Sequence, residues 1–259
     1  MLCVLPLCPF GLAQRAAQPA PACMPGGPVI SAATPRATED PLRNDWGQLA
    51  HYHAANMRLP PSAVHDSRVV FMGDSITERW GRDGGFFLGR PYINRGIKGQ
   101  TTPQMLVRFR ADVIALRPKV VVILAGTNDI AGNTGPTTLE AIEDNLTSMA
   151  ELAEANGIRV VLASVLPVVD YPWRPCLNPA GKIAALNAWI RGYCSRHERV
   201  FLDYYSALVD EKGGLKAEFT FDGVHPNEAG YRVMAPLADQ AIGQALNYVR
   251  TLGLVEEGG

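Results

Sequence analysis

Val120-Val121-Val122-Ile123-Leu124 is an unbroken run of β-branched and aliphatic residues, and Ile158-Arg159-Val160-Val161-Leu162 is nearly so. Runs of this kind are typical of strands buried on both faces of a parallel sheet, because a strand with one solvent face alternates apolar and polar residues. The apolar segments that are predicted as strands are 68–72, 92–95, 119–124, 158–163 and 199–203.

Helical segments alternate with these strands. They are predicted near 102–116, 138–156, 180–197 and 227–248, and a peripheral helix is predicted over 44–57, before the break at Leu59-Pro60-Pro61. The alternation predicts an α/β fold, a three-layer doubly wound sandwich around a five-stranded, mainly parallel sheet. Ligands of such sheets bind beyond the carboxyl ends of the strands.

Length and charge limit the classes of function. The 259 residues show no internal repeat or second core, which favours a single domain. Lysine and arginine total 24 against 25 acidic residues, and no basic cluster is visible, so nucleic acid is not expected as a partner. After residue 41 no apolar run reaches the roughly 18 residues of a membrane helix.

The N-terminal segment differs from the rest. Residues 1–12 are apolar and uncharged, and residues 13–41 are rich in alanine and proline. Residues 1–41 are therefore predicted to be a leader or a disordered extension, and residues 42–259 the folded domain. Export to the periplasm or the outside is favoured, although the basic start of a secretory signal is missing. A cytoplasmic location, with an extension from an upstream start codon, is the alternative.

Two cysteines, Cys176 and Cys194, belong to the predicted domain. In an exported protein they would be expected to pair as a disulfide. Two separate thiols, one of them packed in a helix, is an equally good interpretation.

Four short polar segments carry the residues of a nucleophilic site. Each of the first three follows a predicted strand, and the fourth lies near the C-terminus: Gly73-Asp74-Ser75-Ile76, Asn94-Arg95-Gly96-Ile97-Lys98-Gly99, Gly126-Thr127-Asn128-Asp129 and Asp222-Gly223-Val224-His225-Pro226. Together they hold a hydroxyl nucleophile, an imidazole base, an orienting carboxylate and hydrogen-bond donors, which are the groups that acyl transfer through a serine requires.

These four segments, in this order and at this spacing, resemble the SGNH hydrolases, the family that includes the GDSL lipases and esterases. The resemblance extends over about residues 66–248. It implies a flavodoxin-like SGNH fold, with Ser75, Gly96, Asn128 and His225 in the places of the four residues that name the family. Asp222 precedes the histidine by three residues, as is usual in the family.

The resemblance and the chemistry of the residues together predict their roles. Ser75 would be the nucleophile, His225 the base and Asp222 its orienting acid. Attack of the serine places negative charge on the ester carbonyl oxygen. This oxyanion would accept hydrogen bonds from the backbone N–H groups of Ser75 and Gly96 and from the side-chain amide of Asn128. The plainer alternatives are a helix-capping serine, a turn glycine, a turn asparagine and a hydrogen-bonded pair at a helix start.

A loop at 167–179 follows the fourth predicted strand and should reach the same edge of the sheet. Tyr171 and Trp173 in this loop are candidate substrate-binding residues that could stack on a sugar or an aromatic group. Packing of the loop by the same rings is an equally good interpretation.

The predicted activity is that of a cofactor-free serine esterase, which would hydrolyse small or short-acyl carboxylic esters, carbohydrate acetates among them, through an acyl-enzyme intermediate. Alternatives are acyl transfer to a sugar hydroxyl, lysophospholipase or thioesterase activity, and a non-catalytic carbohydrate-binding module. No metal is expected, because His51 and His53 would point apart on a helix and no cysteine–histidine cluster has zinc spacing. The expected partner is a small-molecule ester, and the sequence does not indicate an oligomeric state.

Overall fold

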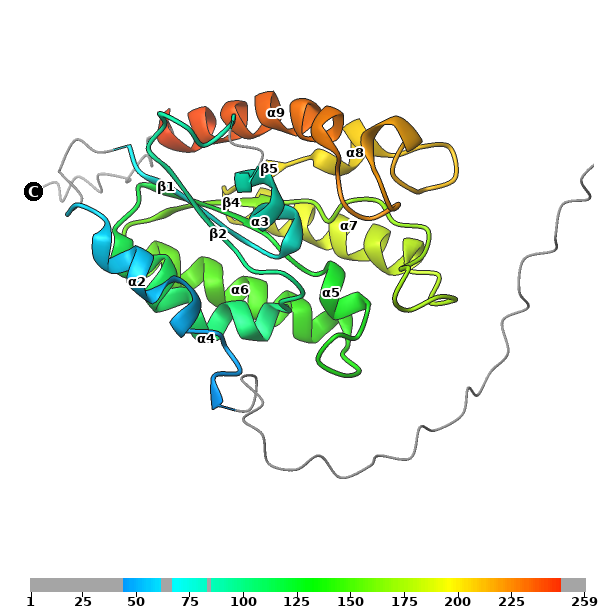
Figure 1. Cartoon of the computed structure of the whole chain (residues 1–259), viewed down its shortest axis with the longest axis horizontal. Coiled ribbons are helices and arrows are strands. Elements are labelled where there is room, and N and C mark those ends of the chain that lie inside the picture. Colours follow the sequence, from blue (N-terminus) through cyan, green and yellow to red (C-terminus); the bar gives the residue numbers. More distant parts are fainter. Residues whose placement is uncertain (1–43, 62–66, 83–84, 248–259) are drawn as a thin grey trace, which may run out of the picture. The chain divides into compact units, whose positions relative to one another are not determined.

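The computed structural model describes residues 44–61, 67–82 and 85–247 (Figure 1). The predicted leader, residues 1–41, lies outside them. The described residues contain no helix that is both long and apolar enough to cross a membrane.

A five-stranded sheet lies at the centre of the fold, with the strands in the order β2-β1-β3-β4-β5. All neighbouring strands are parallel. The strands are β1 (Val69–Gly73), β2 (Tyr92–Gly96), β3 (Val120–Leu124), β4 (Arg159–Ala163) and β5 (Val200–Leu202). The chain leaves β1 toward one edge for β2 and then crosses to β3 on the other side of β1. This reversal creates a topological switch point between β1 and β3, where ligands of such sheets bind.

Helices cover both faces of the sheet, which confirms the three-layer sandwich. The helical elements are α2 (Ala50–Arg58), α3 (Ser75–Arg82), α4 (Thr102–Asp112), η1 (Ile114–Leu116), α5 (Thr127–Ile130), α6 (Leu139–Ala155), α7 (Ala180–Arg196), α8 (Tyr204–Leu208), η2 (Ala217–Phe219) and α9 (Glu228–Asn247). Figure 1 shows α9 on one side of the sheet and α4 and α6 on the other.

Two predicted helices differ in extent from the observed ones. The helix expected over 44–57 is interrupted after Asn44, and α2 begins at Ala50, where the Asp45 carboxylate accepts the N–H groups of Leu49 and Ala50 at 2.8 Å each. The helix expected over 102–116 ends at Asp112 and continues as the separate turn η1, which Arg117 closes with a left-handed φ of 49°.

Alternate side chains of the central strands enter two hydrophobic cores. Val70 and Met72 of β1 pack with α4, α6 and α7 on one face. Val69 and Phe71 pack with residues of α3, α8 and α9 on the other. Because both faces are buried, the polar residues that follow the strands are left at the carboxyl edge of the sheet.

Cys194 is a free, buried thiol on α7. The disulfide between Cys176 and Cys194, one of the two interpretations of the sequence, is therefore wrong. Burial raises the pKa of the Cys194 thiol to about 12, so this side chain is an inert part of the core.

Candidate active site

Ser75 is the first residue of α3 and follows β1 after a tight turn. A Cβ at Gly73 would lie 2.1 Å from Thr77 Oγ1, so the turn requires glycine there. Asp74 holds the start of the helix, because its Oδ1 accepts the Ile76 N–H at 2.9 Å. No described residue accepts a hydrogen bond from the Ser75 N–H, which is free to meet a ligand.

The hydroxyl of Ser75 is in contact with a histidine that lies 150 residues later. Ser75 Oγ and His225 Nε2 are 2.9 Å apart, and His225 Nδ1 is 2.7 Å from Asp222 Oδ2. With Nδ1–H donating to the carboxylate, Nε2 can accept the serine proton. The structure therefore brings together the three residues predicted as the triad.

Asp222 is fixed by several hydrogen bonds. Its Oδ1 accepts the backbone N–H of His225 at 2.8 Å and that of Val224 at 3.0 Å. Burial raises the pKa of this carboxyl, but the hydrogen bonds from His225 and Val224 outweigh it and hold the pKa below its ordinary value. Asp222 is therefore an ionised acceptor that orients the imidazole.

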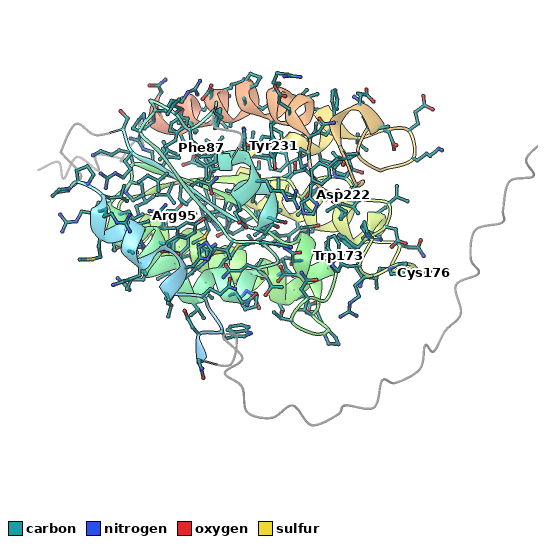
Figure 2. The ribbon with its side chains drawn as sticks, viewed as in Figure 1. Phe87, Arg95, Trp173, Cys176, Asp222 and Tyr231 are labelled. Atoms are coloured by element: carbon teal, nitrogen blue, oxygen red, sulfur yellow. The ribbon has the colours of Figure 1, made fainter. Side chains whose placement is uncertain are left out.

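Aromatic side chains flank the imidazole. The Phe221 ring is stacked on His225, with centroids 5.8 Å apart and planes at 8°, and the Arg79 guanidinium lies 4.9 Å from the Phe221 centroid. The Trp173 ring is tilted at 6.3 Å from His225, and Figure 2 shows Trp173 and Asp222 at the same end of the molecule. Phe221 directly precedes Asp222 but belongs to none of the four polar segments of the sequence.

Asn128 lies in α5, just beyond β3, and its side chain is buried. Its Nδ2 donates one hydrogen to the Gln100 carbonyl at 3.0 Å, and its Oδ1 accepts from Asn133 Nδ2 at 2.8 Å. An amide nitrogen carries two hydrogens, so one N–H of Asn128 remains available to a ligand.

Gly96 does not offer the free N–H that was expected of it. Its N–H donates to Asn94 Oδ1 at 2.9 Å, and its carbonyl accepts the Tyr52 hydroxyl. A Cβ at this position would lie 2.2 Å from the Glu78 backbone nitrogen, so glycine is needed for close packing of β2 against α3. The prediction that Gly96 meets an oxyanion is therefore not supported by its hydrogen bonds.

Gly99, three residues later, has the properties that were expected of Gly96. No described residue accepts its N–H, its φ is 77°, and its carbonyl accepts Asn133 Nδ2 at 3.2 Å. Asn133 thus places Gly99 beside the Asn128 amide. The sequence displays both glycines, and only the hydrogen bonds distinguish them.

Two buried carboxyls support the loops of the site. Asp129 accepts the Thr102 hydroxyl at 2.6 Å and the Thr102 N–H at 3.0 Å, and burial raises its pKa. Burial, with a contribution from Asp129, also raises the pKa of Asp74 to about 7.

The two aromatic residues of the 167–179 loop differ in exposure. Tyr171 has no exposed surface, and its hydroxyl pairs with Thr127 Oγ1 at 3.0 Å, so it packs the loop and does not meet a substrate directly. Trp173 is 42% exposed and donates from Nε1 to Asn133 Oδ1 at 3.1 Å. Of the two candidates, Trp173 alone faces solvent near the triad.

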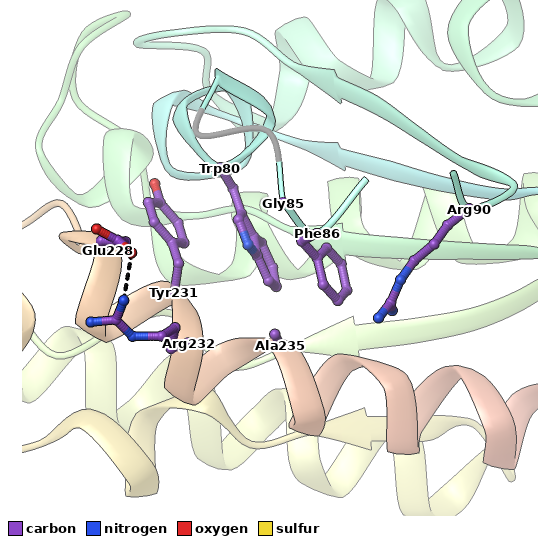
Figure 3. Close-up of a pocket in the computed structure, with 8 residues that line it drawn as sticks. All are labelled: Trp80, Gly85, Phe86, Arg90, Glu228, Tyr231, Arg232 and Ala235. Carbon is purple, nitrogen blue, oxygen red and sulfur yellow. Dashed lines mark hydrogen bonds and ion pairs between the residues drawn. The ribbon is translucent and has the colours of Figure 1, made fainter. Parts of the chain in front are cut away.

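An aromatic cavity lies between α3, the chain at 85–90 and α9 (Figure 3). It encloses about 310 Å³, and its wall includes the stacked rings of Trp80 and Phe86, whose centroids are 4.4 Å apart. Neither Ser75 nor His225 lines it. Within the described residues no group of three or more His, Cys, Asp or Glu side chains is placed to hold a metal ion.

Comparison with known proteins identifies relatives of the whole fold. Residues 71–233 match the model of the GDSL-like Lipase/Acylhydrolase family. A solved structure from Bacteroides fragilis, assigned as an acylhydrolase, is 47% identical, has a TM-score of 0.77, and is matched over 78% of this chain and 99% of its own.

Two curated relatives are more distant. Platelet-activating factor acetylhydrolase IB subunit alpha1 from Bos taurus is 28% identical over 197 residues, 72% of this chain and 77% of the relative. The lipoprotein YqeF of Bacillus subtilis is 33% identical over 150 residues, 57% of this chain and 53% of its own length. The family match includes most of the described fold and all three triad residues, Ser75, Asp222 and His225. The chain therefore belongs to the GDSL-like lipase/acylhydrolase family and is a carboxylic ester hydrolase.

Proposed function

We propose that the protein is a serine esterase that hydrolyses small or short-acyl carboxylic esters through an acyl-enzyme intermediate. The observation that carries this proposal is the continuous hydrogen-bond chain from Ser75 Oγ through His225 to Asp222, with distances of 2.9 and 2.7 Å. A serine hydroxyl becomes a competent nucleophile when a base accepts its proton during attack.

In the acylation step Ser75 Oγ bonds to the ester carbonyl carbon while its proton moves to His225 Nε2. The imidazolium is stabilised by the ionised Asp222 and then gives its proton to the leaving alcohol as the ester C–O bond breaks. In the second step a water molecule gives a proton to His225 and attacks the carbonyl carbon of the acyl-enzyme. The bond to Ser75 Oγ then breaks, so that the acid is released and Ser75 regains its proton from His225.

Negative charge on the carbonyl oxygen would be met by donors that are already fixed. The candidates are the free N–H of Ser75, the second N–H of the Asn128 amide and the free N–H of Gly99. Gly99 replaces Gly96 in this role, because the Gly96 N–H is bonded to Asn94. Donors held in advance of the reaction stabilise the developing charge without a cost of reorganisation.

One observation supports a short acyl group. The relative from Bos taurus is by name an acetylhydrolase.

The test is a set of triad variants assayed on p-nitrophenyl esters of graded chain length and on acetylated sugars. Ser75→Ala should lower kcat by about 10⁴ or more, and the Ser75→Ala/His225→Ala double variant should lose little more than either single variant. Acetyl esters should be hydrolysed with a higher kcat/KM than long-chain esters.

Unchanged melting temperatures would exclude unfolding as the cause of these losses. More than about a tenth of the parent activity in Ser75→Ala, or strictly additive losses, would reject the mechanism. Product analysis with an added sugar acceptor separates hydrolysis from acyl transfer.

A further inference from the structure

Asn133, which lies five residues after Asn128, contacts the site without belonging to any of the four sequence segments. Its Nδ2 donates to Asn128 Oδ1 at 2.8 Å and to the Gly99 carbonyl at 3.2 Å. Its backbone N–H also donates to the Asn128 carbonyl at 3.0 Å. One side chain therefore bridges both residues that are proposed to supply oxyanion donors from outside α3.

The other end of the Asn133 side chain is bonded to the substrate loop. Trp173 Nε1 donates to Asn133 Oδ1 at 3.1 Å, and the same indole lies 6.3 Å from the His225 ring. Contacts thus run without interruption from an exposed ring beside the triad, through Asn133, to the Asn128 amide.

The direction of each hydrogen bond is determined by chemistry. An indole N–H can only donate, so the oxygen of Asn133 faces Trp173 and its NH₂ group faces Asn128. The oxygen of Asn128 must then face Asn133, which turns its NH₂ group toward the Gln100 carbonyl and the site. Trp173 and Asn133 therefore act together with the Gln100 carbonyl to decide which end of the Asn128 amide the oxyanion would meet.

We propose that Asn133 is a positioning residue that fixes the orientation of the Asn128 amide, and that Trp173 couples this orientation to the bound substrate. The inference rests on the proposed function, because it gives Asn128 the part of an oxyanion donor. Substrates that hold the Trp173 ring in place should raise kcat, since they keep the donor aligned in the transition state.

The first variant is Asn133→Asp, which is nearly isosteric but replaces the NH₂ group with a carboxylate oxygen. That oxygen would face Asn128 Oδ1, and the repulsion between the two oxygens would displace the Asn128 amide or turn it over against the pull of the Gln100 carbonyl, so that its N–H no longer meets the developing oxyanion. Loss of one oxyanion donor lowers kcat by about 10²–10³. Asn133→Asp should fall in this range, with KM changed by less than about threefold.

A second variant avoids the added negative charge. Trp173→Phe keeps a ring near His225 but removes the donor that holds the Asn133 oxygen, so that only the contacts of the Asn133 NH₂ group with Asn128 and the Gly99 carbonyl still fix the amide. It should lower kcat by about 3–10-fold, the effect of one neutral hydrogen bond. In Asn133→Ala, which should lose about tenfold or more, the further change Trp173→Phe should have little effect, because the link is already broken.

Asn156→Asp is the matched control. Asn156 is an exposed asparagine at the end of α6, and its amide donates to the Leu152 carbonyl. The same chemical change there should leave kcat within twofold of the parent. Melting temperatures of all variants show whether a loss of activity follows a loss of fold.

The outcomes separate this inference from the proposed function. If Ser75→Ala abolishes activity while Asn133→Asp and Trp173→Phe keep kcat within twofold, the esterase mechanism stands and the positioning role is rejected. A rise in KM with unchanged kcat would also reject it, because it would show a binding contact. If Ser75→Ala stays active, the proposed function fails first.

Discussion

Among single residues, Asp74 has the most unusual environment. It lies between the strand-end glycine and the nucleophile, and its Oδ2 is buried without a hydrogen-bond partner among the described residues. Burial raises its pKa from 3.8 to about 7. Between these two pH values the folded state keeps a proton that the unfolded state releases, so folding stability falls as pH rises through this window.

We expect Asp74→Asn to remove this pH dependence, because the amide keeps an oxygen for the Ile76 N–H and cannot ionise. The change in the free energy of unfolding that the substitution causes should be more favourable at pH 8 than at pH 5, and the two values should differ by a few kcal/mol at most. Urea unfolding of both proteins at the two pH values measures the difference. An equal effect of the substitution at pH 5 and pH 8 would show that Asp74 titrates normally.

Contacts between side chains could be predicted where the two residues are close in the sequence. Asp222 and His225 are three residues apart, and their pairing follows from a short turn that the sequence displays. The free N–H expected at Gly96 is not found, and the sequence could not show this because its partner, Asn94 Oδ1, depends on a side-chain rotamer. Glycine identity alone does not reveal whether close packing or a free N–H requires it.

At the scale of elements, α4 connects two parts of the site through Arg108, which is also one member of a buried ion pair. Arg108 and Asp112 have side chains with no exposed surface and are 3.0 Å apart. Arg108 also donates to the Gly73 carbonyl at 3.1 Å and to Gln100 Oε1 at 2.6 Å. It thereby holds the residue before Asp74 and the residue whose carbonyl fixes Asn128.

Replacing Arg108 with methionine should destabilise the protein by about 3–5 kcal/mol, because Asp112 is left as a buried charge without its partner. The control is Arg232→Met on α9, where Arg232 and Glu228 form a pair that is 67% and 77% exposed. Loss of that pair should cost less than about 1 kcal/mol. Urea unfolding measures both variants, and equal costs would mean that burial of the α4 pair has no energetic consequence.

Elements with a strong pattern were predicted closely. The continuous apolar run at 119–124 became β3 (Val120–Leu124) because both of its faces are covered. The helix predicted over 102–116 was too long, since the chain tightens into η1, whose Ile114 and Leu116 are buried in the core, and then takes a left-handed conformation at Arg117. Packing of Tyr171 in its loop was one of two interpretations of the sequence, which could not choose between them because the partner Thr127 lies 44 residues away.

For the whole molecule, the parallel strands explain why the segments that follow β1 and β3 meet. The carboxyl ends of β1 and β3 adjoin, so Ser75 and Asn128 are neighbours at the switch point of the sheet. This much follows from the order of strands and helices in the sequence. The series of contacts from Trp173 through Asn133 to Asn128 does not follow from that order, because Trp173 and Asn133 are 40 residues apart on loops without periodicity.

The sheet also divides the hydrophobic residues into two cores that share no side chain. Leu146 of α6 belongs to the core on one face, and Met234 of α9 belongs to the core on the other. Figure 1 shows these two helices on opposite sides of the sheet. Truncation of either side chain to alanine should cost about 2–5 kcal/mol through lost burial and a residual cavity.

The two costs should add within about 0.5 kcal/mol in the Leu146→Ala/Met234→Ala double variant, because sites separated by the sheet share no partners. The strands are common to both cores, so the domain should still unfold in one cooperative transition. Urea unfolding followed by far-UV circular dichroism and by tryptophan fluorescence tests both statements. Two separate transitions, each sensitive to one substitution, would instead show that the faces of the sheet unfold independently and that the strands do not couple them.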